Sequence, residues 1–323
     1  MARKRIIYQS QAVAIEQASP SITQTTLMGV QSCNYGVEIS REDVNQYGQL
    51  GAIDKVIMDA PTCTTEVNYY CGGFGGPSAE GANLSGLLRA AIESKTASVL
   101  VALDSTEGQD YSLTATDTVV VLESGSMTSL SCDATVGGIP TNTLNFQGLD
   151  FRYGVNTGAD EVAVPGTALT IATQTGVQIS IADGTTNTKY NNFQTAGVSF
   201  DLGTEVLRRL GDSASPYYYG IVPTFPAQAS INFESLAIDE GIKTVVSNLK
   251  QSAKTSSSVV LGGMTNVSIN VGGTGYKLVN GTVDSHKFSS SIGDNVTLDA
   301  TFNASIGGAN SLQKMLVGLK ADM

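Results

Sequence analysis

Two stretches of this 323-residue chain carry the same series of landmarks: GVEISREDVNQYGQLGAIDKVIMDAPTCTTEVNY at residues 36–69 and GVSFDLGTEVLRRLGDSASPYYYGIVPTFPAQASINF at residues 197–233. Each opens on Gly-Val, passes through a polar stretch to Leu-Gly and meets Pro-Thr. The closing triplets are Val67-Asn68-Tyr69 and Ile231-Asn232-Phe233. The offset of roughly 160 residues is about one domain length, which indicates a duplicated domain rather than a short repeat.

The segments around the two copies predict strands and one amphipathic helix in each half. Four apolar residues follow the spacing i, i+3, i+4, i+7 within residues 84–93, and four more follow it within residues 239–251. Runs such as ASVLVALDS at 97–105 and TNVSINVGG at 265–273 are rich in strand-forming residues. We therefore expect a mainly β or α+β chain of two fused antiparallel β-sandwich or barrel-like domains, each with one packed helix.

Turn signals divide the chain into three parts. Residues 1–18 precede Ser19-Pro20 and are predicted to be an N-terminal arm. Residues 19–155 are the first predicted domain and residues 156–323 the second. Additional strands near 166–190, with a turn at Asp183-Gly184, depart from a plain duplication. Two roles stay open for these strands: they could decorate the outside of the protein, or they could pair between the two domains.

Composition limits the classes of function. The chain has 15% charged and 41% hydrophobic residues, 35 Gly and no Trp, which is typical of a globular β-rich protein. A net charge of −11 and a pI near 4.5 argue against a nucleic-acid-binding surface, which needs clustered Lys and Arg. The basic cluster Arg3-Lys4-Arg5 is too short to change this and is expected to solvate a mobile N-terminus. No apolar run reaches the roughly 20 residues of a membrane helix, so we expect a cytosolic product.

The residue types that could carry chemistry do not form a recognisable site. His286 is the single histidine, and we expect it in a loop, without a nucleophile pair. The run Gly72–Gly76 lacks the phosphate-loop pattern and is predicted to be a flexible connector. Glu42 and Asp43 are adjacent acids in a predicted loop, where charges are normally solvated. Five Asn-x-Ser/Thr matches are chance products of the composition: Asn83, Asn266, Asn280, Asn295 and Asn303.

Cysteine and tyrosine usage points to packing. The four cysteines are Cys33, Cys63, Cys71 and Cys132, all in the first half, so we expect reduced and mostly buried thiols rather than a disulfide scaffold. The absence of close pairs argues against zinc. The aromatic cluster Tyr217–Tyr219 is expected to bury at a domain or subunit contact. We predict no catalytic residue, no cofactor and no metal.

The repeated landmarks, followed by helices at 84–93 and 239–251, resemble the tail tube (major tail) proteins of tailed bacteriophages. The resemblance implies a structural virion protein whose rings stack into a hollow tube that delivers DNA to the host cell. Tubes of this family carry six domains per ring, so a fused pair implies a homotrimeric pseudo-hexamer. Residues 41–59 and 203–219 match the loops that reach the next ring, and residues 1–18 an arm for inter-ring contact.

The resemblance also implies where the protein works and with what. It implies that the protein belongs to the virion tail and is assembled in the host cytoplasm. The implied partners are other copies of itself, the tail terminator and the baseplate or tip, with no membrane; whether a sheath surrounds the tube stays open. DNA passes the lumen without specific binding, and acidic groups facing a channel would repel its phosphates.

Three other classes of function stay open. A tail-tip, fibre or adhesin-type binding module fits a β-rich chain, with the strands near 166–190 as its recognition surface. A capsid or decoration protein is a structural neighbour of the tube. An enzyme acting on carbohydrate would need a carboxylate pair.

Overall fold

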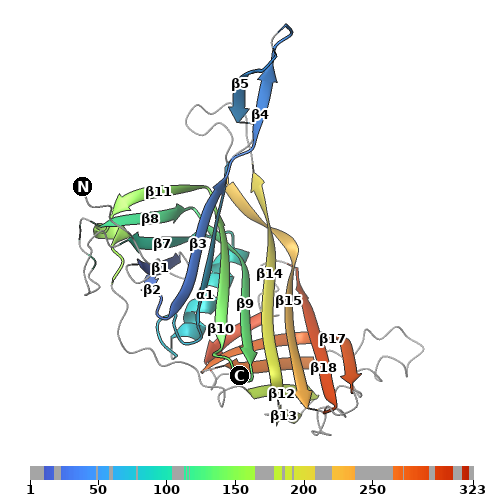
Figure 1. Cartoon of the computed structure of the whole chain (residues 1–323). Helices are drawn as coiled ribbons and strands as arrows, with labels where there is room; N and C mark the ends of the chain where they lie inside the picture. The colour runs from blue at the N-terminus through green and yellow to red at the C-terminus, as the bar shows by residue number, and fades with distance from the viewer. Residues whose placement is uncertain are drawn as a thin grey trace.

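A computed structural model of the chain describes residues 11–17, 23–48, 50–57, 61–77, 79–103, 113, 115, 117–163, 178–183, 186–190, 193–207, 220–236, 265–271, 273–290, 295–307 and 315–319. The described residues form antiparallel sheets of five and twelve strands, a two-stranded hairpin and one α-helix (Figure 1). The predicted mainly antiparallel β fold is confirmed. The second predicted helix, 239–251, lies outside the described residues, and the division into two domains stays a prediction.

Eight long strands form the main layer of the molecule. Four come from the first half, in the order β3 (Val30–Glu38), β6 (Thr62–Tyr70), β10 (Thr141–Gly148) and β9 (Ser126–Thr135). Four come from the second half, in the order β14 (Phe193–Leu207), β15 (Gly220–Leu236), β18 (Thr297–Ile306) and β17 (Thr274–Ser289). Strands β9 and β14 pair directly, so one sheet runs through both halves. We call these eight strands the large sheet.

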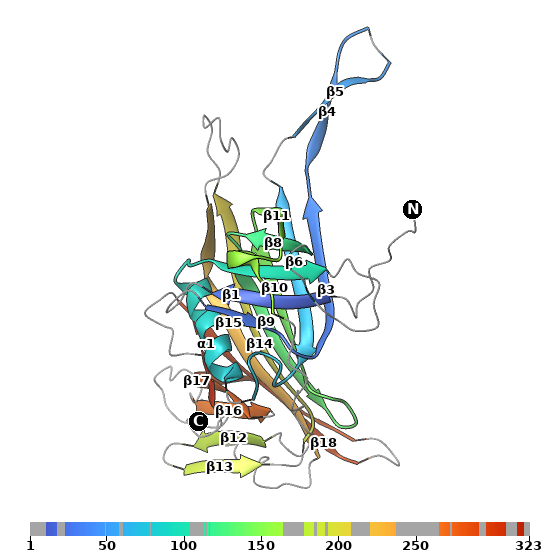
Figure 2. The same ribbon diagram turned by 90° about the vertical axis from the view of Figure 1, so that its left-hand side faces the viewer.

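Shorter strands and the helix make a second layer on one face of the large sheet (Figure 2). The five-stranded sheet has the order β11 (Asp150–Val155), β8 (Thr118–Glu123), β7 (Ala97–Leu103), β1 (Gln11–Gln17) and β2 (Thr23–Thr26). In the second half, the beginning of β17 pairs with β16 (Thr265–Val271) and β19 (Met315–Leu319), and β16 continues to β12 (Gln178–Asp183) and β13 (Thr186–Tyr190).

The strand pairings of the two halves correspond one to one. In the first half the pairs are β1·β2, β1·β7, β7·β8, β8·β11, β3·β6, β6·β10 and β10·β9. In the second half they are β12·β13, β12·β16, β16·β17, β17·β19, β14·β15, β15·β18 and β18·β17. The strands near 166–190 that are described are therefore not an addition, because β12 and β13 take the place that β1 and β2 take in the first half.

This correspondence also corrects the expected N-terminal arm. Residues 11–17 form β1, which is paired on both sides in the middle of the five-stranded sheet. Ala12, Val13, Ala14 and Ile15 are buried, because Val13 and Ile15 belong to the main core while Ala12 and Ala14 pack on the opposite face of the sheet. Residues 1–10 lie outside the described part of the chain.

A repeated corner carries the chain from the second layer into the large sheet. Ser124 and Asn280 have left-handed backbones with φ of 49° and 53°, and each is followed by a glycine. A Cβ on Gly125 would lie 2.5 Å from the carbonyl oxygen of Ala97, so a side chain does not fit there. The corner separates β8 from β9, whereas β17 continues through it as a single long strand.

The core lies between the two layers. Helix α1 (Glu80–Ile92) turns the predicted apolar stripe of Leu84, Leu87, Leu88 and Ala91 inward, and all four are buried. The large-sheet strands alternate buried and more exposed positions, as in the pattern iBeBeBiBi of β6, so only one face contributes to the core.

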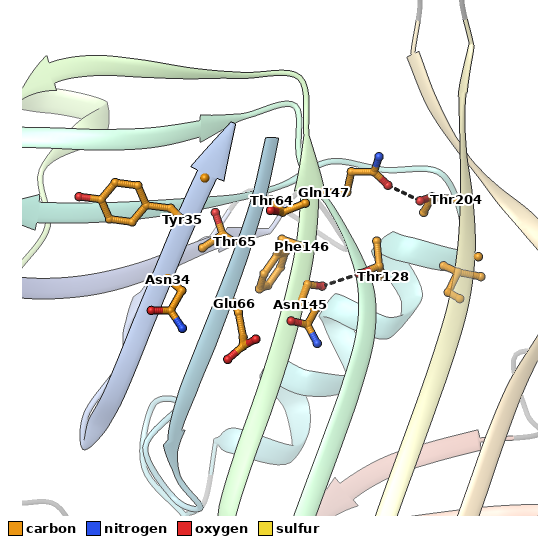
Figure 3. Close-up of a pocket in the computed structure, with 13 residues that line it drawn as sticks. Asn34, Tyr35, Thr64, Thr65, Glu66, Thr128, Asn145, Phe146, Gln147 and Thr204 are labelled. Carbon is orange, nitrogen blue, oxygen red and sulfur yellow. Dashed lines mark hydrogen bonds between the residues drawn. The ribbon is translucent and has the colours of Figure 1, made fainter. Parts of the chain in front are cut away.

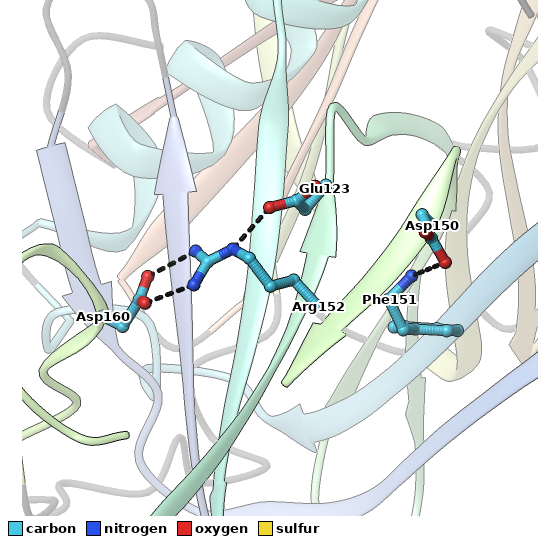
Figure 4. A network of polar contacts seen from close by, with 5 residues as sticks. All are labelled: Glu123, Asp150, Phe151, Arg152 and Asp160. Atoms are coloured by element: carbon cyan, nitrogen blue, oxygen red, sulfur yellow. Dashed lines mark hydrogen bonds and ion pairs between the residues drawn. The ribbon is translucent and has the colours of Figure 1, made fainter. Parts of the chain in front are cut away.

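An exposed ion-pair network braces the outer edge of the five-stranded sheet (Figure 4). On β11, the Arg152 guanidinium donates to Glu123 Oε1 at 2.5 Å and to both carboxylate oxygens of Asp160 at 2.6 and 2.7 Å. The hydrogen bonds from Arg152 lower the pKa of Asp160. Because Asp160 belongs to the turn after β11, the network holds that turn against the strand.

Candidate functional site: the open face and the end strands of the large sheet

The large sheet has one face that no described element covers, as the two ribbon views show (Figures 1 and 2). We call it the open face. Its side chains are almost all hydroxyls, amides and carboxylates, because each strand alternates them with core residues. Its uncharged members include Thr64, Asn68, Ser131, Thr143, Asn145, Ser199, Ser230, Asn232, Thr301 and Asn303.

The charges on the open face are mainly negative. Its carboxylates include Glu66, Asp133, Asp201, Glu234 and Asp299. Among the described residues of the eight strands the lysine and arginine side chains are Lys277 and Lys287, and Lys277 lies in the second-layer part of β17. Glu234 lies directly opposite Asp299, which lies opposite Lys287. Burial raises the pKa of Asp133. Such a surface repels anions such as the phosphates of DNA.

A hollow of about 590 Å³ opens among β3, β6, β10, β9 and β14 (Figure 3). Hydrogen bonds within its wall run from Thr128 Oγ1 to the Asn145 carbonyl at 3.2 Å and from Thr204 Oγ1 to Gln147 Oε1 at 2.5 Å. Among the described residues of the lining, Glu66 is the one carboxylate and there is no lysine or arginine. The described lining therefore supplies no cationic side chain for a phosphate group.

The large sheet ends on β3 at one side and on β17 at the other. Strand β3 pairs with β6 alone among the described strands. From Thr282 to Lys287, β17 pairs with β18 on one side and with no described strand on the other. Both strands thus present backbone N–H and C=O groups that another strand could pair with.

A two-stranded hairpin projects beyond the large sheet (Figure 1). It consists of β4 (Arg41–Asn45) and β5 (Ala52–Ile57), within the segment 41–59. Tyr47 and Leu50 at its tip are fully exposed. Of the matching segment 203–219, residues 203–207 extend β14 and residues 208–219 lie outside the described part.

Several residues weighed from the sequence lie elsewhere than expected. His286 belongs to β17 and not to a loop. Glu42 and Asp43 belong to β4, also not to a loop, although both are exposed, and Asp43 pairs with Lys55 at 3.3 Å. Within the described ranges, no cluster of three His, Cys, Asp or Glu side chains could hold a metal ion. Tyr217–Tyr219 and Arg3–Arg5 lie outside these ranges.

The glycine-rich run Gly72–Gly76 is not a flexible connector. Phe74 is buried, and the Gly73 carbonyl accepts a hydrogen bond from the Met28 amide at 2.8 Å. A Cβ on Gly73 would overlap the Met28 carbonyl oxygen. Glycine is needed there because two backbone segments approach closely.

The four cysteines are free thiols, as expected. Cys63, Cys71 and Cys132 are buried, and Cys33 is partly buried. Burial raises the pKa of Cys33 to about 12 and that of Cys63 to about 11, so neither thiol is a reactive nucleophile at neutral pH.

A buried polar network, which the sequence did not reveal, joins the two halves. Glu80 at the start of α1 is fully buried, and its carboxylate accepts hydrogen bonds from the Gly72 amide at 2.5 Å, Asn142 Nδ2 at 2.9 Å and Thr274 Oγ1 at 2.9 Å. The Tyr276 hydroxyl donates to Asn142 Oδ1 at 3.0 Å. Thr274 and Tyr276 belong to β17, so the second half supplies part of the network. Burial raises the pKa of Glu80 although its hydrogen bonds oppose this.

Comparison with known proteins gives a partial structural likeness to solved structures. No protein-family model matches the chain, and no curated protein matches it. The solved structures that resemble it include the SPP1 tail tube, determined by solid-state NMR and cryo-electron microscopy. That match has 15% sequence identity and a TM-score of 0.33, and it covers 47% of this chain and 80% of that chain. Separately, no helix among the described residues is long and apolar enough to cross a membrane.

Proposed function

We propose that this chain is a structural subunit of a bacteriophage tail tube, in which copies join into rings and rings stack into a hollow cylinder that delivers DNA. One observation carries the proposal. Two four-stranded units with the same strand order meet edge to edge at β9 and β14, while β3 and β17 remain at the ends of the large sheet. Repeating that contact between chains is a head-to-tail association, which closes into a ring when the rotation per unit fits.

The size of such a ring follows from strand geometry. Three chains would supply 24 strands to one barrel, because each supplies eight. With strands about 4.8 Å apart and tilted by about 40°, a 24-stranded barrel measures about 48 Å across its backbone. Side chains pointing inward would narrow the channel to about 38 Å. A DNA duplex is narrower than this, because its grooves are only about 8 Å deep around a narrow central stack of base pairs.

The open face suits the wall of the lumen. The second layer of strands and α1 occupy the other face, so they would lie outside the barrel. Carboxylates on the open face would then repel the phosphates of passing DNA, and the shortage of basic side chains would leave no strong binding point. The proposed role is structural and not catalytic.

The projecting hairpin suits contact between stacked rings. Tyr47 and Leu50 at its tip would gain from burial against the next ring, at about 25 cal/mol for each Å² of apolar surface removed from water. The protein would then belong to the virion tail. Its neighbours would be further copies and the proteins that end or surround the tube.

The proposal is tested by electron microscopy and light scattering of the purified protein at rising concentration. Rings or tubes with an axial channel are the expected result. A particle that remains strictly monomeric at high concentration would count against the tube, and glycan or cell binding by that monomer would favour an adhesin instead.

A further inference from the structure

The contact between β9 and β14 inside the chain provides a template for contact between chains. There, Val198 lies opposite Cys132, Ser199 opposite Ser131 and Phe200 opposite Leu130. The apolar side chains of these pairs point to the covered face and are buried, with Phe200 and Leu130 each 1% exposed. Ser199 lies on the open face.

The equivalent residues of β3 follow from the strand beside it. Val67 of β6 and Ile231 of β15 hold the same place in the two predicted copies. Cys33 lies opposite Val67, and Val198 lies opposite Ile231, so Cys33 corresponds to Val198. This structural correspondence is shifted by four residues from the sequence landmarks, in which Gly36-Val37 matches Gly197-Val198 and Val37 therefore takes the place of Val198. It makes Asn34 correspond to Ser199 and Tyr35 to Phe200.

The equivalent residues of β17 follow in the same way from β10 and β18. Leu144 lies opposite Val67 and Phe302 opposite Ile231, so Thr143 corresponds to Thr301. Ser131 lies opposite Thr143, and Ser285 lies opposite Thr301. Ser285 therefore corresponds to Ser131. One residue along, His286 corresponds to Cys132, and Val283 corresponds to Leu130 across the bulge between Val283 and Ser285.

Exposure separates the inner junction from the end strands. Tyr35 is 39% and Val37 46% exposed, whereas Phe200 and Leu202, which correspond to them, are 1% exposed. Val283 is only partly buried against the core, whereas Leu130 is 1% exposed. Within the described part of the chain, the end strands thus carry apolar side chains of the covered face without a neighbour of the kind that β9 and β14 give each other.

We infer that β3 of one chain pairs antiparallel with β17 of a second copy in the register of the β9·β14 junction. This rests on the proposed function. In that register Cys33 faces His286 of the partner subunit, Asn34 faces the partner's Ser285 and Tyr35 faces the partner's Val283. The partner is another copy because both edges belong to this chain and the chain already makes this contact within itself.

The register is tested with a cysteine pair on the open face. Asn34 and Ser285 are both exposed, so Asn34→Cys and Ser285→Cys are expected to leave the fold intact. Residues directly opposite across antiparallel strands have Cβ atoms about 4.5–5.5 Å apart, close to the spacing of a disulfide. The double variant, built on Cys33→Ser, is assembled and then treated with a copper–phenanthroline catalyst and dissolved oxygen as the oxidant.

The expected result is loss of the monomer band and gain of a covalent trimer on non-reducing gels, because each chain carries one exposed, introduced thiol for each neighbour while Cys63, Cys71 and Cys132 are buried. Each single variant should stay monomeric on the gel. The pair Asn34→Cys and Lys287→Cys, shifted by two residues on the same face, should link far less.

Preferential linking by the shifted pair would overturn the register but leave edge pairing and the tube intact. Rings seen by microscopy without linking in either pair would overturn the β3·β17 contact. Failure of the unmodified protein to assemble would contradict the proposed function, and the β3·β17 contact between chains would then fall as well.

Discussion

Replacing Glu80 should loosen the connection between the two halves. The Glu80→Ala variant leaves three donors without their acceptor: the Gly72 amide, the Asn142 amide and the Thr274 hydroxyl. Each buried unsatisfied donor costs about 1–3 kcal/mol, so three donors set a loss of at least about 3 kcal/mol, and water that enters the space of the lost side chain satisfies part of the remainder. We expect the free energy of unfolding of the unassembled subunit to fall by about 3–5 kcal/mol.

Glu80→Gln separates the charge of this side chain from its shape. One carboxylate oxygen becomes an amide that can only donate, so a donor meets a donor and about 1–3 kcal/mol is lost. The pKa of Glu80 is raised in the folded state, so the folded chain holds this proton more tightly than the unfolded chain. Its contribution to stability is complete below the unfolded pKa of about 4.3 and is lost as the pH rises through the folded pKa. The stability gap between wild type and Glu80→Gln should therefore narrow as the pH rises through this window.

The assay is urea unfolding followed by circular dichroism at a series of pH values. Glu93→Gln is the matched control, because Glu93 follows the last turn of the same helix, near Arg89 and Lys95 on the surface. It should change stability little. A Glu80→Ala variant no less stable than this control, or a gap that widens with rising pH, would refute the reasoning.

Three further changes probe other parts of the molecule. Gly73→Ala should destabilise the subunit and lower its melting temperature by several degrees, since the new methyl overlaps a backbone carbonyl, whereas Gly76→Ala, in open space, should cost less although the backbone of Gly76, unlike that of Gly73, is left-handed. Replacing Tyr47 and Leu50 together by serine should leave single rings intact but prevent long tubes, which electron microscopy would detect; tubes of normal length would contradict a stacking role for the hairpin. Asp201→Lys on the open face should not prevent assembly but should make tubes retain DNA, with retention weakening as salt rises; tubes that ignore DNA at low salt would argue against this face as the channel wall.

The sequence predicted the fold class, α1 and the existence of a repeat, because these depend on local periodicity and composition. It misplaced β1, because QAVAIEQ is short and its burial depends on pairing with β7, at least 80 residues away along the chain. For the same reason β12 and β13 were read as an addition. The Gly-Val landmarks gave the wrong alignment of the two copies on β3 and β14. Which residues correspond depends on the pairing register and its bulges, which the sequence does not show.

The candidate site was predicted only in outline. An excess of carboxylates was evident, but their collection on one face depends on the strand order, which the sequence does not state. The sequence also did not show which strands end the large sheet. The pairing of β9 with β14 joins the two halves and leaves β3 and β17 at its ends. Glu80 carried a weak signal, since an acid that begins a helix after a glycine run suits the positive helix end, yet that position is usually solvated.

Cryo-electron microscopy of the assembled protein tests the central claim most directly. The account predicts a ring of three chains, six four-stranded units, one continuous barrel about 48 Å across its backbone and the open face lining the channel. A particle without an axial channel, or a ring whose channel is lined by α1 and the second layer of strands, would contradict it.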